Sequence, residues 1–198
     1  MFHISSLTLK RKTDINALLS CLRSILYIGR AIAAANFLRG LPYLMELKKT
    51  KLFPIGLICV AVSGDCVTKI YLSDTEYFDD SPVIDEAFNQ LSEYFEGRRR
   101  EFDLKLKYDN ATPFQAKVYD ALKNTEYGKC ITYKDLAILA GNKNAARAVG
   151  GALNKNPIMI VIPCHRVIAK NNIGGFAYGL KIKKMLLSLE GNKSEDLA

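Results

Sequence analysis

Histidine, tryptophan and paired cysteines are scarce or missing in this sequence of 198 residues. It contains two histidines, no tryptophan and no Cys-x-x-Cys pair. An odd number of widely separated cysteines argues against both a disulfide framework and a zinc ribbon, and favours a reducing compartment. With so few histidines, a metal site would need cysteine and carboxylate ligands almost alone, so we expect no catalytic metal and no cofactor. The cysteines are Cys21, Cys59, Cys66, Cys130 and Cys164.

Long uninterrupted apolar runs are also missing. Residues 15–45 are rich in apolar side chains, but Arg23, Arg30 and Arg39 break the run into pieces. Each piece is shorter than the roughly 18 residues that a membrane span needs, and the arginines also fit a signal peptide poorly. We expect residues 1–50 to form a helical extension of unknown role. It is either an amphipathic helix or hairpin packed on the rest of the protein, or a helix at a membrane interface.

The net positive charge comes from the C-terminal half of the chain. Residues 1–96 contain 10 Lys and Arg against 11 Asp and Glu, whereas residues 97–198 contain 18 against 9. A one-sided surplus suits binding to a phosphate backbone, because each neutralised phosphate releases condensed counterions. The alternative is a solvated surface that keeps the protein soluble.

The sequence predicts a small α+β domain over residues 51–109. Two short β-branched runs on either side of Gly64 predict a hairpin. Ser81 can cap a helix that Pro82 opens, with apolar side chains on one face. A further strand is expected over residues 102–108.

The second domain, residues 110–198, begins with a capped helix, "TPFQAKVYDALK", that starts after Thr112. Next come a short helix, "YKDLAIL", capped by Thr132, a turn containing Gly141, and a helix with small residues, "AARAVGGALN". Two short helices joined by such a turn are typical of a helix-turn-helix. Helical hairpins of this kind are common, so this pattern alone indicates DNA binding only weakly.

A cysteine and a histidine stand side by side where an apolar segment ends. Residues 157–163, "PIMIVIP", predict a short buried strand that Pro163 terminates, because proline has no N–H for the ladder. Cys164 and His165 follow directly. A free thiol is only a few per cent thiolate at neutral pH. Half ionisation at pH 7 needs a pKa shift of about 1.5 units, or roughly 2 kcal/mol.

Either an imidazolium or an imidazole base backed by a carboxylate can supply this stabilisation of the thiolate. His165 is the only plausible imidazole, and the two side chains can cooperate only if Pro163 turns the chain. The carboxylate candidate is Glu190, embedded in the apolar helix "KKMLLSLEG". The glycine-rich stretch "NNIGGFAYG" can close over a flat ligand. Together these features suggest a thiol that attacks an electrophile carried on DNA.

These motifs resemble the 6-O-alkylguanine-DNA alkyltransferase family. The resemblance rests on "IPCHRVI", an Asn-Pro upstream of the cysteine, the glycine-rich loop and the LLxxE helix, and is densest from Thr112 onward. It implies a mixed α/β fold with an RNase H-like N-terminal domain and a C-terminal winged helix-turn-helix domain. It also implies a single-turnover methyltransferase that flips the damaged base and moves the alkyl group from the guanine 6-oxygen onto Cys164.

The resemblance assigns a role to each site residue. Cys164 is the alkyl acceptor, His165 is a base that acts through a water, and Glu190 orients His165. Asn156 holds the turn and the guanine pocket, and Tyr133 helps to rotate the nucleotide. The implied DNA- and substrate-binding residues are Thr132, Tyr133, Ala146, Arg147, Ala148, Gly150, Gly151, Arg166, Val167, Phe176 and Ala177.

The implied partner is double-stranded DNA containing 6-O-alkylguanine, bound through the minor groove without sequence preference. Arg147 fills the gap that the flipped base leaves, and its small neighbours let the helix approach the duplex. We expect a monomer without a membrane partner, located in the cytoplasm or, in a eukaryote, the nucleus. Residues 1–50 have no counterpart in the family. Tyr178 stands beside the pocket loop and is expected to narrow tolerance for large alkyl groups.

Three other classes of function are weighed against this one. An alkyltransferase-like module binds the lesion but lacks the acceptor cysteine, which this chain has in Cys164. A winged-helix regulator would bind DNA according to its base sequence rather than according to the presence of a lesion. A cysteine hydrolase needs an oxyanion hole, and the sequence has no signature of one.

Overall fold

The N-terminal sheet is a meander of three antiparallel strands, β1 (Leu47–Phe53), β2 (Gly56–Ser63) and β3 (Cys66–Leu72). The computed structural model describes residues 46–108 and 110–192. The predicted hairpin is confirmed as β2 and β3. Strand β1 was not predicted and begins before the expected domain limit at residue 51. Its "LKKTKLF" is mostly half-buried or exposed, so it lacks the alternation that marks a strand. The predicted extension otherwise lies outside the described residues.

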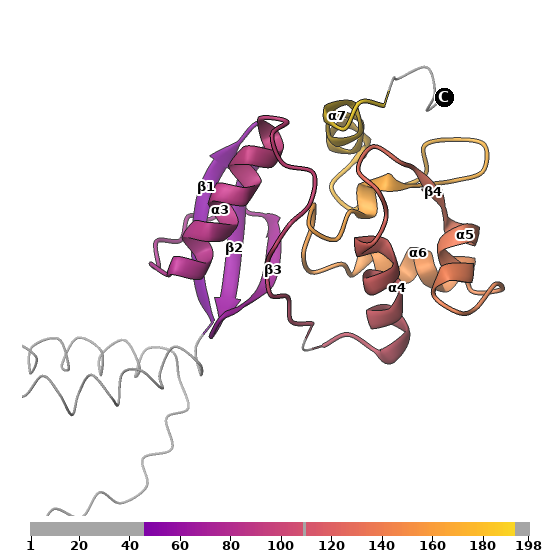
Figure 1. Ribbon diagram of the computed structural model, residues 1–198, viewed down its shortest axis with the longest axis horizontal. Helices are drawn as coiled ribbons and strands as arrows, with labels where there is room; N and C mark the ends of the chain where they lie inside the picture. The colour runs from indigo at the N-terminus through magenta and orange to yellow at the C-terminus, as the bar shows by residue number, and fades with distance from the viewer. Residues whose placement is uncertain (1–45, 109, 193–198) are drawn as a thin grey trace, which may run out of the picture. The chain divides into compact units, whose positions relative to one another are not determined.

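Helix α3 (Pro82–Phe95) covers one face of this sheet (Figure 1). It starts as predicted, with the Ser81 side chain accepting a hydrogen bond from the Val83 backbone N–H. Its buried face includes Leu91 and Tyr94 and packs into the main core. Tyr94, at the end of the helix, therefore faces inward.

The strand predicted over residues 102–108 is wrong. The Asp103 backbone of this segment exchanges hydrogen bonds with the Gln90 side chain of α3, and the segment pairs with a described strand only through one isolated parallel bridge, between Val67 and Leu106. Its two backbone hydrogen bonds join Val67 to Lys105 and Lys107. The alternating apolar pattern of residues 102–108 therefore belongs to an extended segment that pairs with β3 at one residue and not to a strand.

The strand predicted over residues 157–163 is also wrong, although the segment is buried as expected. Ile158 bridges Ile70 of β3, and the chain then reverses, with Ile160 at a φ of 72°. A β-branched residue rarely adopts this left-handed conformation, so the turn is held by its surroundings. The reversal brings the chain to Pro163 while anchoring it to the N-terminal sheet.

The C-terminal domain is mainly helical, and its helices follow the predicted ones. Thr112 and Gln115 form a reciprocal capping box at the first helix, and Thr132 caps the second. The predicted helix-turn-helix pair is α5 and α6 (Figure 1). No helix in the described part of the chain is long and apolar enough to cross a membrane. The elements are α4 (Pro113–Lys123), β4 (Ile131–Thr132), α5 (Tyr133–Leu139), α6 (Ala146–Asn154), the 3-10 helix η2 (Cys164–Arg166), β5 (Val167–Ile168) and α7 (Leu180–Leu189), with β4 parallel to β5.

Candidate active site

Cys164 is the first residue of η2 and is almost completely buried. The Asn156 amide nitrogen Nδ2 donates to its sulfur at 3.1 Å and to the Ile162 carbonyl at 2.9 Å. The Asn156 oxygen accepts from the Ile158 N–H at 3.0 Å. Asn156 therefore clamps the turn before Cys164 and places an N–H donor on the sulfur.

Burial raises the pKa of the Cys164 thiol. The Asn156 donor and the backbone N–H groups at the start of η2 lower the pKa, but burial outweighs them. In this resting arrangement the sulfur is therefore a neutral thiol rather than a thiolate. Because the sulfur is not ionised in advance, a base must take its proton when the reaction occurs.

His165 is fully buried, and its Nε2 lies 2.7 Å from the Glu190 oxygen Oε1. Burial lowers the pKa of this imidazole, while the Glu190 carboxylate acts in the opposite direction. The neutral ring donates Nε2–H to the carboxylate, which leaves a lone pair on Nδ1. Among the described residues, Nδ1 has no hydrogen-bond partner. Of the two ways to activate the thiol, this geometry favours an imidazole base over an imidazolium.

Glu190 lies at the centre of the buried polar network. Its Oε1 accepts from His165, from the Tyr94 hydroxyl at 2.8 Å and from Arg166 Nη2 at 3.1 Å. Its Oε2 accepts from Arg166 Nε at 2.8 Å and from the Gly128 N–H at 3.2 Å. Burial alone would raise the pKa of this carboxyl, but His165 and Arg166 outweigh it and lower the pKa to about 2. Glu190 is therefore a fixed anion behind the imidazole.

Arg166, which we predicted to bind DNA or substrate, lies in the buried network around Glu190. It is buried, with its guanidinium bonded to Glu190 and to the Thr125 carbonyl at 2.6 Å. The same group lies 5.8 Å from the centroid of the Tyr127 ring. A guanidinium held in this way orients the Glu190 carboxylate.

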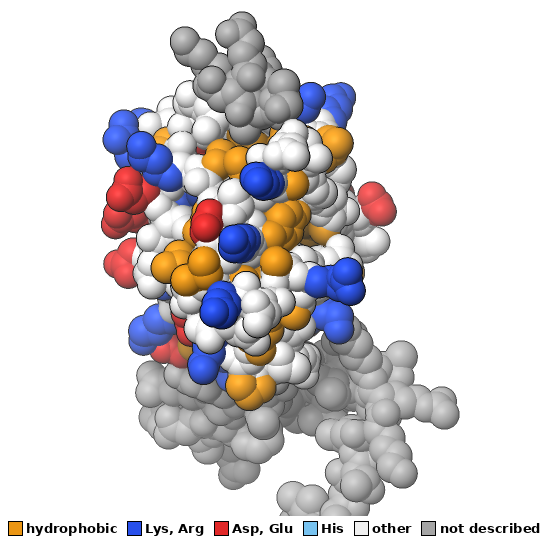
Figure 2. Space-filling view, turned by 90° about the vertical axis from the view of Figure 1, so that its right-hand side faces the viewer, with side chains coloured by type: hydrophobic (Ala, Val, Ile, Leu, Met, Phe, Trp, Pro, Cys, Tyr) orange, Lys and Arg blue, Asp and Glu red, His pale blue; other side chains and the backbone are white. Residues whose placement is uncertain are grey.

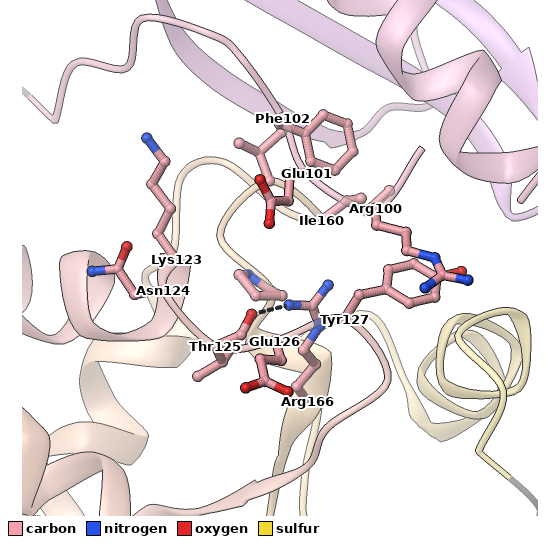
Figure 3. A pocket seen from close by; sticks show the side chains of 12 residues that line it. Arg100, Glu101, Phe102, Lys123, Asn124, Thr125, Glu126, Tyr127, Ile160 and Arg166 are labelled. Atoms are coloured by element: carbon pink, nitrogen blue, oxygen red, sulfur yellow. Dashed lines mark hydrogen bonds between the residues drawn. The ribbon is translucent and has the colours of Figure 1, made fainter. Parts of the chain in front are cut away.

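Arg166 also lines a cavity of about 280 Å³ (Figure 3). Figure 3 shows the Arg166–Thr125 hydrogen bond on one side of this cavity and Glu101, from the loop after α3, on the opposite side. Arg100, from the same loop, lies 5.7 Å from the Tyr127 ring centroid. The N-terminal domain thus reaches the immediate surroundings of the catalytic network.

Tyr133 and the glycine-rich loop lie together. Gly174 has a φ of 70°, and a Cβ added there would meet the Tyr133 ring at 3.2 Å. Tyr133 also forms a hydrogen bond with the backbone of Gly175, and it lies near enough to Cys164 for a charge on that sulfur to raise the Tyr133 pKa. On the same loop, Phe176 and Tyr178 stack edge to face with centroids 5.7 Å apart. The glycine-rich loop and Tyr133 therefore lie side by side near Cys164.

Lys183 was missed by the sequence analysis. It is fully buried on α7, and its Nζ donates to the carbonyls of Val167 and Ile173 at 2.6 Å and of Gly175 at 3.0 Å. Burial lowers its pKa to about 8. Its helical spacing to Glu190 is the signal that could have revealed it, because Lys183 on α7 and Glu190, the residue that caps α7, are both buried on the same side. Lys183 therefore links the glycine-rich loop, residues 171–179, to β5, the strand that follows η2.

The predicted DNA-binding residues of α6 form an exposed face. Arg147, Ala148 and Gly151 are exposed, and a Cβ on Gly150 would lie 3.8 Å from the Tyr133 ring. Figure 2 looks at the side of the molecule that carries α5 and shows Lys and Arg side chains spread around a hydrophobic centre, with scattered acidic ones. Helix α6 thus presents Arg147 and small residues beside the Tyr133 site.

The predicted site residues fall into two groups. The first group is buried and comprises Cys164, His165, Arg166 and Glu190, with the half-buried Asn156 bonded to Cys164. The second group lies around the pocket and α6; it comprises Thr132, Tyr133, Ala146, Arg147, Ala148, Gly150, Gly151, Val167, Phe176 and Ala177. Within residues 46–108 and 110–192, no three His, Cys, Asp or Glu side chains are placed to hold a metal ion.

Comparison with known proteins matches both domains. Residues 50–108 match the ribonuclease-like domain of 6-O-methylguanine DNA methyltransferase, and residues 113–192 match its DNA-binding domain. The constitutive methylated-DNA–protein-cysteine methyltransferase of Bacillus subtilis is 39% identical over 150 residues, covering 69% of this chain and 90% of that protein. A probable enzyme of the same name from Acanthamoeba polyphaga mimivirus is 41% identical over 157 residues, covering 76% and 99%.

A solved structure, Mycobacterium tuberculosis OGT in complex with DNA, superposes with a TM-score of 0.66 at 36% identity. The match covers 72% of this chain and 92% of that one. The buried Cys-His-Glu network and the exposed α6 face thus occur in a chain that matches both domains of one family. The chain belongs to the 6-O-methylguanine DNA methyltransferase family.

Proposed function

We propose that this protein repairs DNA by moving the alkyl group of 6-O-alkylguanine onto the sulfur of Cys164. The observation that carries the proposal is the buried relay, in which Glu190 holds the His165 imidazole with a free lone pair on Nδ1 next to the acceptor cysteine. The relatives named methylated-DNA–protein-cysteine methyltransferase support it.

The reaction balances without a cofactor. His165 takes the thiol proton, through a bridging water as the family resemblance implies, while the Asn156 amide stabilises the developing charge on sulfur. The sulfur attacks the alkyl carbon and the carbon–oxygen bond breaks. Its electron pair stays with guanine, which takes up the released proton. The resulting thioether has no good leaving group, so each molecule reacts once.

Access to the target requires the base to leave the duplex. Its 6-oxygen lies within the stack, so the nucleotide must be flipped at a cost of a few kcal/mol. Arg147, exposed on α6, fills the vacated space, and its small neighbours let the helix enter the minor groove. The positive C-terminal half supplies affinity that does not depend on sequence. The protein acts as a monomer where the DNA lies, in the cytoplasm or the nucleus.

Mass spectrometry tests the proposal. The protein is mixed with an oligonucleotide that contains one 6-O-methylguanine, and intact and peptide masses are measured. We expect one methyl group on the Cys164 peptide, saturating at one per protein and absent in Cys164→Ala. Tight binding without a mass change would instead make the protein a lesion-recognition module with a silent cysteine.

DNA recognition has its own test. We expect wild-type protein to bind duplexes of unrelated sequence equally, with affinity falling as salt rises. Arg147→Ala should slow methyl transfer from duplex DNA while leaving the reaction with free 6-O-benzylguanine unchanged, because the free base needs no flipping. Binding that followed one DNA sequence rather than the lesion would point to a transcription regulator.

A further inference from the structure

The N-terminal domain contributes a hydrogen-bond donor to the catalytic carboxylate. Tyr94, at the end of α3, is fully buried, and its hydroxyl donates to Glu190 Oε1 at 2.8 Å. The same oxygen lies 2.7 Å from His165 Nε2. With Arg166 Nη2 at 3.1 Å, three donors share this carboxylate oxygen, and Tyr94 is the one that comes from the N-terminal domain.

The Tyr94 ring is held firmly in this position. Its centroid lies 5.5 Å from that of Phe102 and 6.1 Å from that of Tyr127, the latter edge to face. Packing of this kind needs only a ring, and phenylalanine would provide it. A buried hydroxyl must find a partner, and here the partner is the carboxylate that holds the catalytic imidazole. Burial and the Glu190 charge raise the pKa of Tyr94, so it remains a protonated donor.

We propose that Tyr94 is a positioning residue for alkyl transfer, acting through Glu190 to set how strongly the carboxylate holds His165. This inference rests on the proposed function and deepens it. It gives the N-terminal domain a part in the reaction, because the hydroxyl reaches the relay from a helix of that domain.

Sharing of one oxygen predicts the direction of the effect. Each donor to Oε1 draws off part of the negative charge of that oxygen. Loss of the Tyr94 hydroxyl therefore leaves more negative charge on Oε1 to attract the His165 ring. The imidazolium form of His165 is then stabilised and its pKa rises. His165 must be neutral to accept a proton, so the acid limb of the rate–pH profile moves to higher pH. The titratable and charged groups around this relay are Tyr94 from α3, Tyr127 and Cys130 from the loop after α4, Cys164 and Arg166 from η2, and Lys183 from α7.

The test compares Tyr94→Phe with Tyr127→Phe. Tyr127 belongs to the same aromatic cluster, but its hydroxyl donates to the Leu189 carbonyl at 3.0 Å rather than to Glu190. We expect Tyr94→Phe to move the acid limb to higher pH by about one unit, as for loss of one hydrogen bond to a charged group, so single-turnover methyl transfer at a pH below that limb slows about tenfold. Tyr127→Phe should leave the position of the acid limb unchanged.

Two further measurements separate positioning from a structural effect. Since the chain has only two histidines, His3 and His165, the His165 ring can be followed by NMR without substrate. Its titration should move upward in Tyr94→Phe alone. Replacing Tyr94 by a fluorinated tyrosine keeps the hydroxyl and makes it a stronger donor, so the acid limb should move to lower pH.

The outcomes distinguish this inference from the proposed function. Wild-type protein that transfers no methyl group would contradict the proposed function itself. Wild-type transfer, together with Tyr94 variants whose acid limb and His165 titration match those of wild type, would overturn the role of Tyr94 and leave the function intact.

Discussion

The Glu190 network gives a prediction whose size follows from the structure. Glu190→Gln keeps the shape of the side chain but removes the charge that His165 and Arg166 share. The pKa of Glu190 is lowered from 4.5 to about 2 in the folded protein. Each pKa unit corresponds to about 1.4 kcal/mol, so the ionised carboxyl contributes about 3 kcal/mol to the free energy of unfolding. Removal of one partner from a buried ion pair costs a similar amount.

Thermal unfolding measures this contribution. For a protein of this size, about 3 kcal/mol corresponds to a loss of about 6–12 °C in Tm at neutral pH. The sign of the pH dependence is fixed because the folded pKa is the lower one. The extra free energy of unfolding of wild type over Glu190→Gln is fully present above pH 4.5, the pKa of Glu190 in the unfolded chain. It is lost as pH falls through about 2, the pKa of Glu190 in the folded protein.

A matched control is Glu126→Gln, which removes an exposed carboxyl from the loop after α4. We expect its Tm to stay close to that of wild type at every pH, because exposed charges contribute little. Methyl transfer should also be much slower in Glu190→Gln alone, since His165 loses its anionic partner. A Tm loss of less than about 2 °C for Glu190→Gln at neutral pH, or one that does not shrink in acid, would refute this reasoning.

Three further predictions concern the surroundings of the relay. Lys183→Met leaves the carbonyls of Val167, Ile173 and Gly175 without their lysine donor, so reaction with free 6-O-benzylguanine should slow about tenfold or more, whereas Lys184→Met, at an exposed position, should react normally. Equal rates would show that the loop does not need this lysine. Gly128→Ala should lower Tm more than Gly97→Ala: both glycines have φ near 70°, but only at Gly128 would a Cβ meet a backbone oxygen, at 2.6 Å. Calorimetry measures both Tm values, and equal losses of Tm would mean that the backbone shifts to relieve the contact at position 128. Tyr178 should make wild-type protein prefer methyl over benzyl adducts, and Tyr178→Gly should reduce that preference; competition in which wild-type protein repairs both adducts at equal rates would rule this out.

Local signals in the sequence were sufficient for the helices and for the fold class. Ser81, Thr112 and Thr132 are caps that satisfy the first N–H groups of their own helices, and each helix begins where its cap predicts. The adjacent Cys164 and His165 likewise required only the chain itself. Interactions of this kind lie within a few residues or within one motif.

The strands were harder to predict because pairing partners are remote. Strand β1 carries a lysine-rich sequence and exists because β2 offers it hydrogen bonds. Residues 102–108 and 157–163 have the apolar texture of strands, yet each meets β3 only at an isolated bridge. Periodicity reports which side chains are buried, and it does not say whether a neighbouring edge is free to pair.

Sequence by itself determined the helices, the two-domain order and the acceptor cysteine with its histidine, because caps and a contiguous motif encode them locally. Tertiary structure alone decided the protonation states and the connections of the relay. It buried Arg166 beside Glu190, and it brought the hydroxyl of Tyr94, which lies 96 residues from Glu190, to within 2.8 Å of the Glu190 carboxylate. Burial and the meeting of remote segments set the energy of each charge, and neither is written in the neighbouring residues.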